Sequence, residues 1–172
     1  MRIISNMYQH LGRYLKDKVL DNGGRPAFNW VDLWYEQTEF EELAEAIDYP
    51  ALFMAFGSDD ITTIGLKEQD VRVITEIYVA VNNLQDTNLD SVERGEALHY
   101  LELCARVHEV LQGYEHPKVG NLDRIGFAPF NARTNLIVYR LTYSSRQFDI
   151  SPLQKKEGPA IKPEPVNFFN PL

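Results

Sequence analysis

The sequence is poor in cysteine and has no long apolar run. Cys104 is the single cysteine among 172 residues, so an internal disulfide is excluded and a reducing compartment is expected. No apolar stretch approaches the roughly 18 residues that span a bilayer. Polar residues also interrupt the first seven positions before a signal-peptide core can form. These shortages predict synthesis in the cytosol and no membrane partner.

Positive charge is also in short supply. The chain has 17 Lys and Arg against 25 Asp and Glu, which gives a formal net charge of −8. A protein that binds nucleic acid through its main surface needs a stripe of basic residues that displaces counterions. The acidic balance therefore disfavours a nucleic-acid-binding protein of this kind. An acidic wall around a passage for DNA stays compatible with the charge. The proportions of hydrophobic (44%) and charged (24%) residues are those of an ordinary globular protein.

The motifs of common catalytic and nucleotide-binding sites are missing. There is no phosphate-binding loop, no Gly-x-Gly-x-x-Gly, no Gly-x-Ser-x-Gly and no Cys-x-x-Cys. One Glu-x-x-His pair, Glu96 and His99, has the spacing of di-iron ligands, but such sites need a second pair. The sequence therefore predicts a protein that is not an enzyme and that uses no cofactor and no metal.

The other thiol and imidazole groups favour packing over chemistry. Cys104 and His108 are one helical turn apart, on a stripe predicted to be apolar. A small buried cysteine beside a hydrogen-bonded histidine is expected there, rather than a catalytic pair. His10 and His116 have no partners at ligand spacing in the sequence.

Two long stretches alternate as β-strands do. In residues 70–81, one face carries Val71, Val73, Thr75, Ile77, Val79 and Val81. Residues 135–148 have the same character, with Ile137, Tyr139, Leu141 and Tyr143 on one face. A side-chain period of two with β-branched residues on one face predicts strands that are half buried in a sheet.

Two helices are predicted to cover this sheet. The first has an apolar stripe of Ile4, Tyr8, Leu11, Leu15 and Val19. The second is expected to begin at an Asp90 cap, with Glu93 completing a capping box, and to end at Gly113. Its broad apolar side includes Ala97, Leu101, Cys104, Ala105, His108 and Leu111.

Shorter strand patterns complete the predicted sheet. Residues 27–37 and 50–56 read as strands, residues 57–60 as a turn, and residues 61–69 as a hairpin arm. Residues 120–130 read as a strand that Pro129 confines to an edge or a bulge. The predicted fold class is α+β: a mixed or antiparallel sheet of about five strands, covered by two helices, with a long hairpin arm and an extended C-terminal tail.

The composition changes after residue 150. Five of the nine prolines fall in residues 151–172, which favours extended chain over regular structure. We therefore divide the chain into an α+β domain (residues 1–150) and a proline-rich arm (residues 151–172). This arm also carries the apolar residues Ile161, Val166, Phe168 and Phe169. Two alternatives stay open: a free tail, and a segment that orders along a neighbouring subunit.

Several of these patterns together resemble a known family. They are the strand of residues 50–56 (PALFMAF), the strand of residues 70–81, the helix ending Leu111-Gln112-Gly113, and the strand of residues 135–143 (NLIVYRLTY). The chain resembles in these parts the tail terminator, or tail completion, proteins of long-tailed bacteriophages. The resemblance spans most of residues 49–148, while the aromatic segment from Trp30 to Tyr35 and the proline-rich tail depart from it.

The resemblance implies a structural virion protein. Such proteins form a ring, usually of six copies, that caps the tail tube, ends its polymerisation and joins the tail to the head. Implied partners are further copies, the tail tube protein, neck and head-completion proteins, and the sheath where a tail has one. DNA would pass through the ring without sequence-specific binding. The implied location is the tail-neck region of the virion, and the host cytoplasm during assembly.

Two sets of residues are the predicted contacts between subunits or with partners. They are Ile61, Ile64 and Leu66 on the hairpin, and Ile161, Val166, Phe168 and Phe169 in the tail. A head-completion or adaptor protein of the neck is a close alternative. A rival of another class is a small α+β ligand-binding protein or enzyme, with Trp30, Trp34 and Tyr35 as a pocket wall and Cys104 or His108 taking part.

Overall fold

The computed structural model describes residues 2–66, 68–82 and 86–149. The helices are α1 (Arg2–Lys18), the 3-10 turn η1 (Gln37–Glu39), α2 (Glu41–Glu45), α3 (Arg94–Ala97) and α4 (His99–Leu111). The strands are β1 (Trp30–Leu33), β2 (Ala51–Gly65), β3 (Glu68–Val81), β4 (Glu115–His116), β5 (Gly120–Asn121), β6 (Asp123–Phe130) and β7 (Ile137–Asp149). The predicted proline-rich arm lies outside the described residues.

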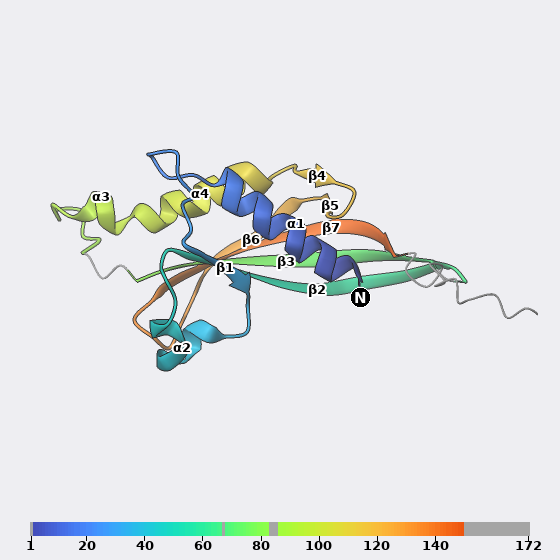
Figure 1. Ribbon diagram of the computed structural model, residues 1–172, viewed down its shortest axis with the longest axis horizontal. Helices are drawn as coiled ribbons and strands as arrows, with labels where there is room; N and C mark the ends of the chain where they lie inside the picture. Colours follow the sequence, from blue (N-terminus) through green and yellow to red (C-terminus); the bar gives the residue numbers. More distant parts are fainter. Residues whose placement is uncertain (1, 67, 83–85, 150–172) are drawn as a thin grey trace, which may run out of the picture.

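One long, twisted sheet forms the middle layer of the molecule (Figure 1). Its strand order is β1-β2-β3-β7-β6, with β1 parallel to β2 and the other pairs antiparallel. This confirms the predicted α+β class and the mixed sheet of five strands. Pro129 lies in the edge strand β6, where its missing N–H leaves no ladder bond unmade.

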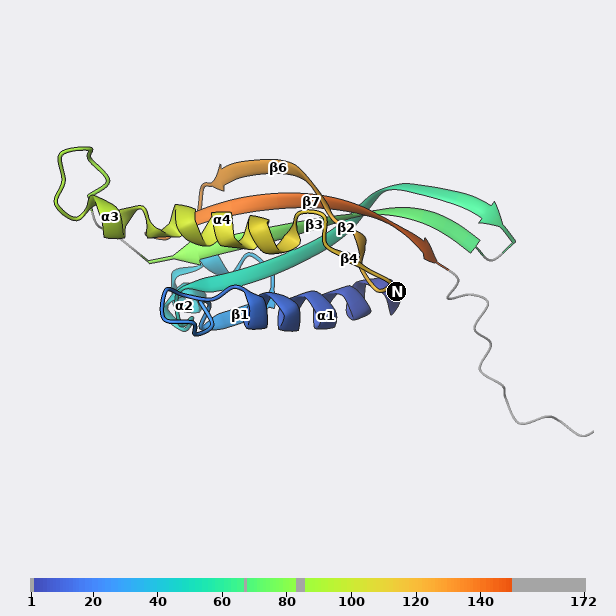
Figure 2. The ribbon, with the colours of Figure 1, turned by 90° about the horizontal axis from the view of Figure 1, so that it is seen from above.

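The two long helices cover one face of the sheet. Figures 1 and 2 show α1 and α4 on the same side of β3 and β7. The alternation predicted for β3 is observed, because Val73, Ile77 and Val79 are all buried under these helices. From α1 the core takes Met7, Leu11 and Leu15, and from α4 it takes Leu103, Cys104, Val107 and Leu111. The helices thus seal one face of the body of the sheet.

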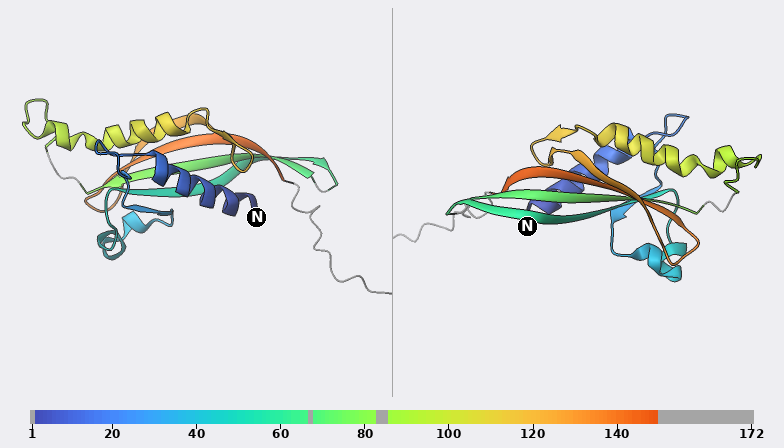
Figure 3. Two further views of the ribbon diagram at one scale, coloured as in Figure 1. Left: turned by 45° about the horizontal axis from the view of Figure 1, so that its top comes forward. Right: turned by 180° about the vertical axis from the view of Figure 1, so that it is seen from behind.

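An aromatic cluster closes the opposite face at one end. The ring of Trp34 stacks on Tyr78 with centroids 4.1 Å apart, and Phe130 meets Trp34 edge-on at 5.3 Å. The segment containing η1 and α2 lies beside this cluster, on the far side of the sheet from α1 and α4 (Figure 3). Trp34 therefore packs as a core residue, whereas Trp30 stays 39% exposed at the edge of the sheet.

The strand predicted for residues 27–37 is shorter in the structure. Only Trp30–Leu33 pairs as β1, parallel to the start of β2. Glu36 has a φ of 65°, which turns the chain out of the extended conformation. The side chain of Gln37 then binds this turn, accepting from the backbone N–H of Tyr35 (2.9 Å) and donating to the carbonyl of Leu33 (2.8 Å).

The turn predicted at residues 57–60 is wrong. β2 continues through this stretch to Gly65, with a bulge between Ser58 and Asp60 that keeps it paired with β3. Asp59 and Asp60 lie within reach of arginines on β3 and β7, so cross-strand charge offsets the poor strand propensity of Gly-Ser-Asp-Asp. The predicted hairpin arm is therefore longer than residues 61–69.

The predicted capping box at Asp90 is also wrong. The backbone N–H of Asp90 donates to the side-chain oxygen of Asn88, which forms a local turn. The helix α3 begins only at Arg94 and has no side-chain cap. Leu98 separates α3 from α4. The predicted end is confirmed, since Gly113 follows α4 with a φ of 70°, a conformation that glycine adopts without strain.

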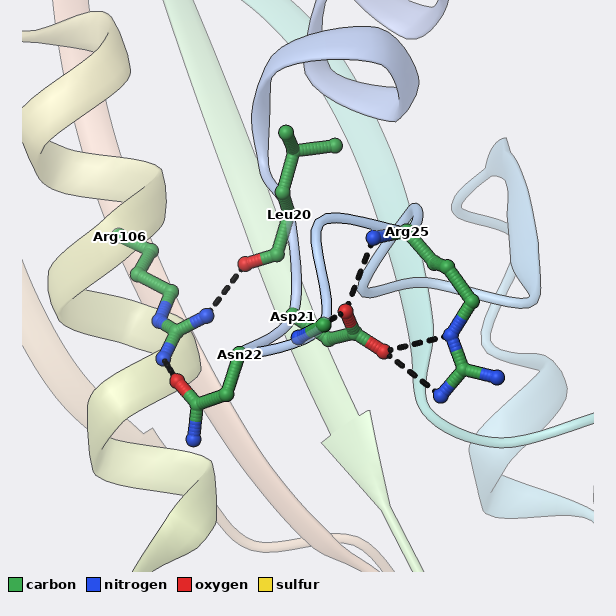
Figure 4. A network of polar contacts seen from close by, with 6 residues as sticks. Leu20, Asp21, Asn22, Arg25 and Arg106 are labelled. Carbon is green, nitrogen blue, oxygen red and sulfur yellow. Dashed lines mark hydrogen bonds and ion pairs between the residues drawn. The ribbon is translucent and has the colours of Figure 1, made fainter.

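Arg106 joins α4 to the loop that follows α1 (Figure 4). Its guanidinium donates to the carbonyl oxygen of Leu20 and to the side-chain oxygen of Asn22. In the same loop Asp21 accepts from the backbone N–H groups of Arg25 (2.9 Å) and Gly23 (2.8 Å), which lowers the pKa of its carboxyl. This network fixes the two covering helices to each other at one end.

Replacing Arg106 with alanine should lower the free energy of unfolding by about 1–2 kcal/mol, because a charged donor to two oxygens is lost. Chemical denaturation monitored by circular dichroism measures the change. Arg133→Ala is a matched control, since the Arg133 side chain is 86% exposed and lies 3.8 Å from Glu39. It should change stability by less than about 0.5 kcal/mol. Equal midpoints for both variants would contradict the role given to Arg106.

Candidate functional site

Part of the sheet extends beyond the helices that cover it. Figure 2 shows the β2–β3 hairpin running past the ends of α1 and α4, with the end of β7 alongside. We call residues 57–65, 68–72 and 144–149 the three-stranded arm; β3 pairs with β2 and β7 along it. Some residues of the arm near the helices are buried, such as Ser145 on β7, which is 4% exposed. Residues 57–64 of β2 are all exposed.

Large apolar side chains lie exposed on the three-stranded arm and at its tip. Ile61 is 55% exposed and Ile64 53%, and Leu66 at the hairpin end is fully exposed. Phe148 on β7 is 69% exposed. The three hairpin residues predicted from the sequence are therefore together on one projecting element, with Phe148 as an addition that the sequence reasoning missed. The other predicted contacts, Ile161, Val166, Phe168 and Phe169, lie outside the described residues.

Charged side chains tie the three strands of the arm together. Arg146 on β7 donates to Asp70 on β3 (2.6 Å) and to Asp60 on β2 (3.3 Å). Arg72 pairs with Asp59 at 3.2 Å. Arg72 and Arg146 are directly opposite each other on β3 and β7, a placement that would be repulsive without these carboxylates. The pairs are solvent-exposed, so each adds at most about 1 kcal/mol and chiefly sets the geometry.

The outer edge of β2 is open along the arm. β1 pairs with β2 only from Ala51 to Met54, and among the described residues no other strand lies on that side. From Ala55 to Gly65 the strand therefore presents backbone N–H and C=O groups to solvent. An exposed edge combined with exposed apolar side chains can bind another extended chain by β-strand addition.

Two histidines that are far apart in the sequence meet beside α1. The rings of His10 and His116 stack with centroids 3.8 Å apart, and Nε2 of His10 lies 2.6 Å from the hydroxyl of Tyr114. Burial lowers the pKa of His10, and the charges of His116 and Lys118 lower it further. The cluster attaches the β4–β5 hairpin to α1, a contact that spacing in the sequence could not reveal.

Cys104 lies in the helix-covered core, as predicted, whereas His108, one turn later on α4, is only partly buried. Burial raises the pKa of the Cys104 thiol to about 12. Nδ1 of His108 lies 3.4 Å from the hydroxyl of Tyr143, and burial lowers the pKa of His108. A thiol held in its protonated form is a poor nucleophile, so the geometry gives this pair a packing role.

The Cys104 thiol should therefore react slowly in the folded protein. A rise in its pKa from 9.0 to about 12 lowers the thiolate fraction at pH 8 on the order of a thousandfold. Because the folded state holds this proton more tightly, its contribution to stability is complete below about pH 9 and falls as the pH rises toward 12. Reaction with an aromatic disulfide reagent, with and without denaturant, measures the effect. Equal rates in both conditions would contradict it.

The described ranges 2–66, 68–82 and 86–149 also bear on metal sites and on membrane-spanning helices. No group of three or more His, Cys, Asp or Glu side chains in these ranges is placed to hold a metal ion. None of the helices in them is both long and apolar enough to cross a membrane. The single Glu-x-x-His motif is present on α3 and α4, where His99 lies 3.8 Å from Glu102.

Comparison with known proteins adds no assignment. No protein-family model matches the chain, and no curated protein matches it.

Proposed function

We propose that this chain is a structural assembly protein of the tail terminator type. It acts by self-association into a ring that caps a phage tail tube, ends its polymerisation and joins the tail to the neck. The observation that carries the proposal is the three-stranded arm, a projection that exposes Ile61 and Ile64 along β2 and Leu66 at its tip. Apolar surface that the monomer leaves in water favours contact with another protein.

The shape of the molecule suits a head-to-tail contact. The arm extends from one end of the sheet, while α3 lies at the opposite end (Figures 1 and 2). A surface at one end that binds a different surface on the next copy makes a heterologous contact, which closes into a ring when the rotation between copies allows it. Six copies is the number that the family resemblance implies.

The acidic charge fits a ring that surrounds DNA. A net charge of −8 on each chain places a strong negative potential around the assembly, and like charge reduces adhesion to phosphate. In this proposal the ring lets DNA pass without sequence-specific binding. Its location is the tail-neck region of the virion, and its partners are the tail tube and neck proteins.

The aromatic residues do not favour a ligand-binding alternative. Trp34 is occupied by its stack on Tyr78 and its edge contact with Phe130, so its faces serve the fold. Tyr35 is 57% exposed on the turn after β1. Trp34 therefore supplies packing at one end of the sheet, and Tyr35 lies on an open turn.

Electron microscopy of the purified chain, alone and with tail tubes, tests the proposal. We expect closed rings and a single ring at one end of each tube, with light scattering giving the copy number. Tubes assembled in the presence of the chain should stop growing. Tubes that elongate unchanged and carry no bound chain at their ends would overturn the proposed function.

A further inference from the structure

We propose that the open edge of β2, residues 55–65, receives the C-terminal segment of a neighbouring copy as an added extended strand. The inference rests on the proposed function, because it names the contact that links one subunit of the ring to the next. It assigns the acceptor to one strand edge and the donor to residues 150–172.

The acceptor edge is long enough for a specific site. Residues 55–65 extend over about 35 Å at the usual rise of a strand. The carbonyl of Met54 accepts from the backbone N–H of Trp34 on β1 at 2.8 Å, so β2 already binds a neighbour on this side up to Met54. In a strand the backbone N–H and C=O groups of every second residue point to the same side. Those of Phe56 and Ser58 therefore point to the same side as those of Met54, where no strand follows β1. A strand added there would extend the line of hydrogen bonds that β1 makes to the outer edge of β2.

The usual protection of an edge strand is weakened here. Natural edges carry charges and bulges that repel a neighbouring strand, and β2 has both at Asp59 and Asp60. Each carboxylate, however, is paired with an arginine of the same sheet, Asp59 with Arg72 and Asp60 with Arg146. The repulsion of an incoming strand by these two carboxylates is therefore partly neutralised. Ile61 and Ile64, beyond the bulge, remain exposed and can contact a partner.

The C-terminal segment fits this edge in position and charge. β7 ends at Asp149, which pairs with Gln69 near the tip of the arm, so the segment leaves the domain there. The arm carries the carboxylates of Asp59, Asp60, Glu68 and Asp70 and the guanidinium groups of Arg72 and Arg146. The segment has three lysines (155, 156 and 162) and two glutamates (157 and 164), and its first basic pair, Lys155 and Lys156, complements the acidic side chains of the arm. Residues 166–170 (VNFFN) are a proline-free stretch that can donate and accept along a strand.

The spacing of the apolar residues points to a neighbour rather than to the same chain. Proline at positions 152, 159, 163 and 165 favours extended chain between Asp149 and Val166. At about 3.1 Å for each residue these seventeen steps cover roughly 50 Å, comparable to the full length of β2. A segment that continued in the direction of β7 would carry Phe168 and Phe169 beyond the arm, toward a neighbouring copy.

Disulfide trapping between two variants of the full chain, each with one added cysteine, tests the inference. Thr63→Cys places a thiol on the exposed edge and Asn167→Cys places one in the segment, while the native Cys104 stays buried. After mixing and mild oxidation, we expect a mixed disulfide dimer in yield about tenfold above the control, because docking raises the local thiol concentration to the millimolar range. The control mixes Asn167→Cys with Lys18→Cys, an exposed site at the opposite end of α1 from the arm.

Each outcome decides between the alternatives. Loss of the mixed dimer when Phe168→Asp and Phe169→Asp are added would support docking through the two aromatic side chains. A yield equal to the Lys18 control overturns the inference. The inference is also overturned if a chain with both Thr63→Cys and Asn167→Cys forms only the intramolecular disulfide and no disulfide between copies. Rings seen by microscopy without the trapped dimer would overturn this contact alone and leave the proposed function standing, whereas absence of rings and tube capping would overturn the function.

Discussion

Replacing Ile61, Ile64 and Leu66 together with lysine should leave the chain folded but unable to form rings. The three side chains are between half and fully exposed, so the monomer does not depend on them for its core. Losing their burial in an interface removes about 4 kcal/mol, or on the order of a thousandfold in each association constant. Sedimentation velocity at a concentration where the native chain forms rings measures the loss.

The matched control for this result lies in the loop before α3. Leu89 is 78% exposed and Val92 is fully exposed, and both are remote from the arm. Leu89→Lys with Val92→Lys adds the same kind of charge at apolar positions and should leave ring formation unchanged. If the arm variant assembles as the native chain does, the three-stranded arm is not the interface. If both variants fail to assemble, added positive charge rather than the arm is responsible.

Gly120→Ala should lower the free energy of unfolding by about 2–5 kcal/mol. Gly120 has a φ of 78°, which costs other residues about 1–2 kcal/mol. A Cβ there would also lie 2.7 Å from the carbonyl oxygen of Arg146, a backbone atom of β7 that cannot move aside cheaply. The overlap adds roughly 1–3 kcal/mol. Denaturant titration followed by circular dichroism measures the total.

Gly24→Ala separates the two causes in this prediction. Gly24 has nearly the same φ, 77°, but a Cβ there meets nothing within 4 Å. It should therefore show only the conformational cost, about 1–2 kcal/mol. Equal losses at Gly120 and Gly24 would show that the β4–β5 hairpin can shift away from β7 without cost.

Local periodicity was enough to predict the long strands and the first covering helix, whereas on α4 two members of the predicted apolar side, Leu101 and Ala105, are exposed. The apolar faces of β3 and α1 each recur with one period and are buried as that period requires. β2 shows where the same reasoning fails. Gly57 to Asp60 reads as a turn, yet the stretch stays paired with β3, and its carboxylates pair with Arg72 on β3 and with Arg146, which lies 86 residues after Asp60. Tertiary pairing overrides local propensity at that point.

Contacts between distant segments account for the rest of what the sequence did not reveal. The stack of His10 on His116 joins α1 to a hairpin more than a hundred residues later. The exposed Phe148 and the open edge of β2 depend on where the helices stop covering the sheet. Ile61, Ile64 and Leu66 were predicted as contacts because a projecting hairpin can reach a neighbouring copy, and all three side chains are exposed. Their role in assembly stays a prediction.

The pairing of β7 also determines how the domain responds to mechanical tension. β7 forms thirteen antiparallel residue pairs with β3, and the last of them, at Asp149, is where the C-terminal segment leaves. A pull on that segment along β7, with β3 held at its opposite end near Val81, acts across hydrogen bonds that are perpendicular to the force. The bonds are then strained together in shear rather than opened one by one. A tether attached at this point would transmit force through the sheet without unzipping it.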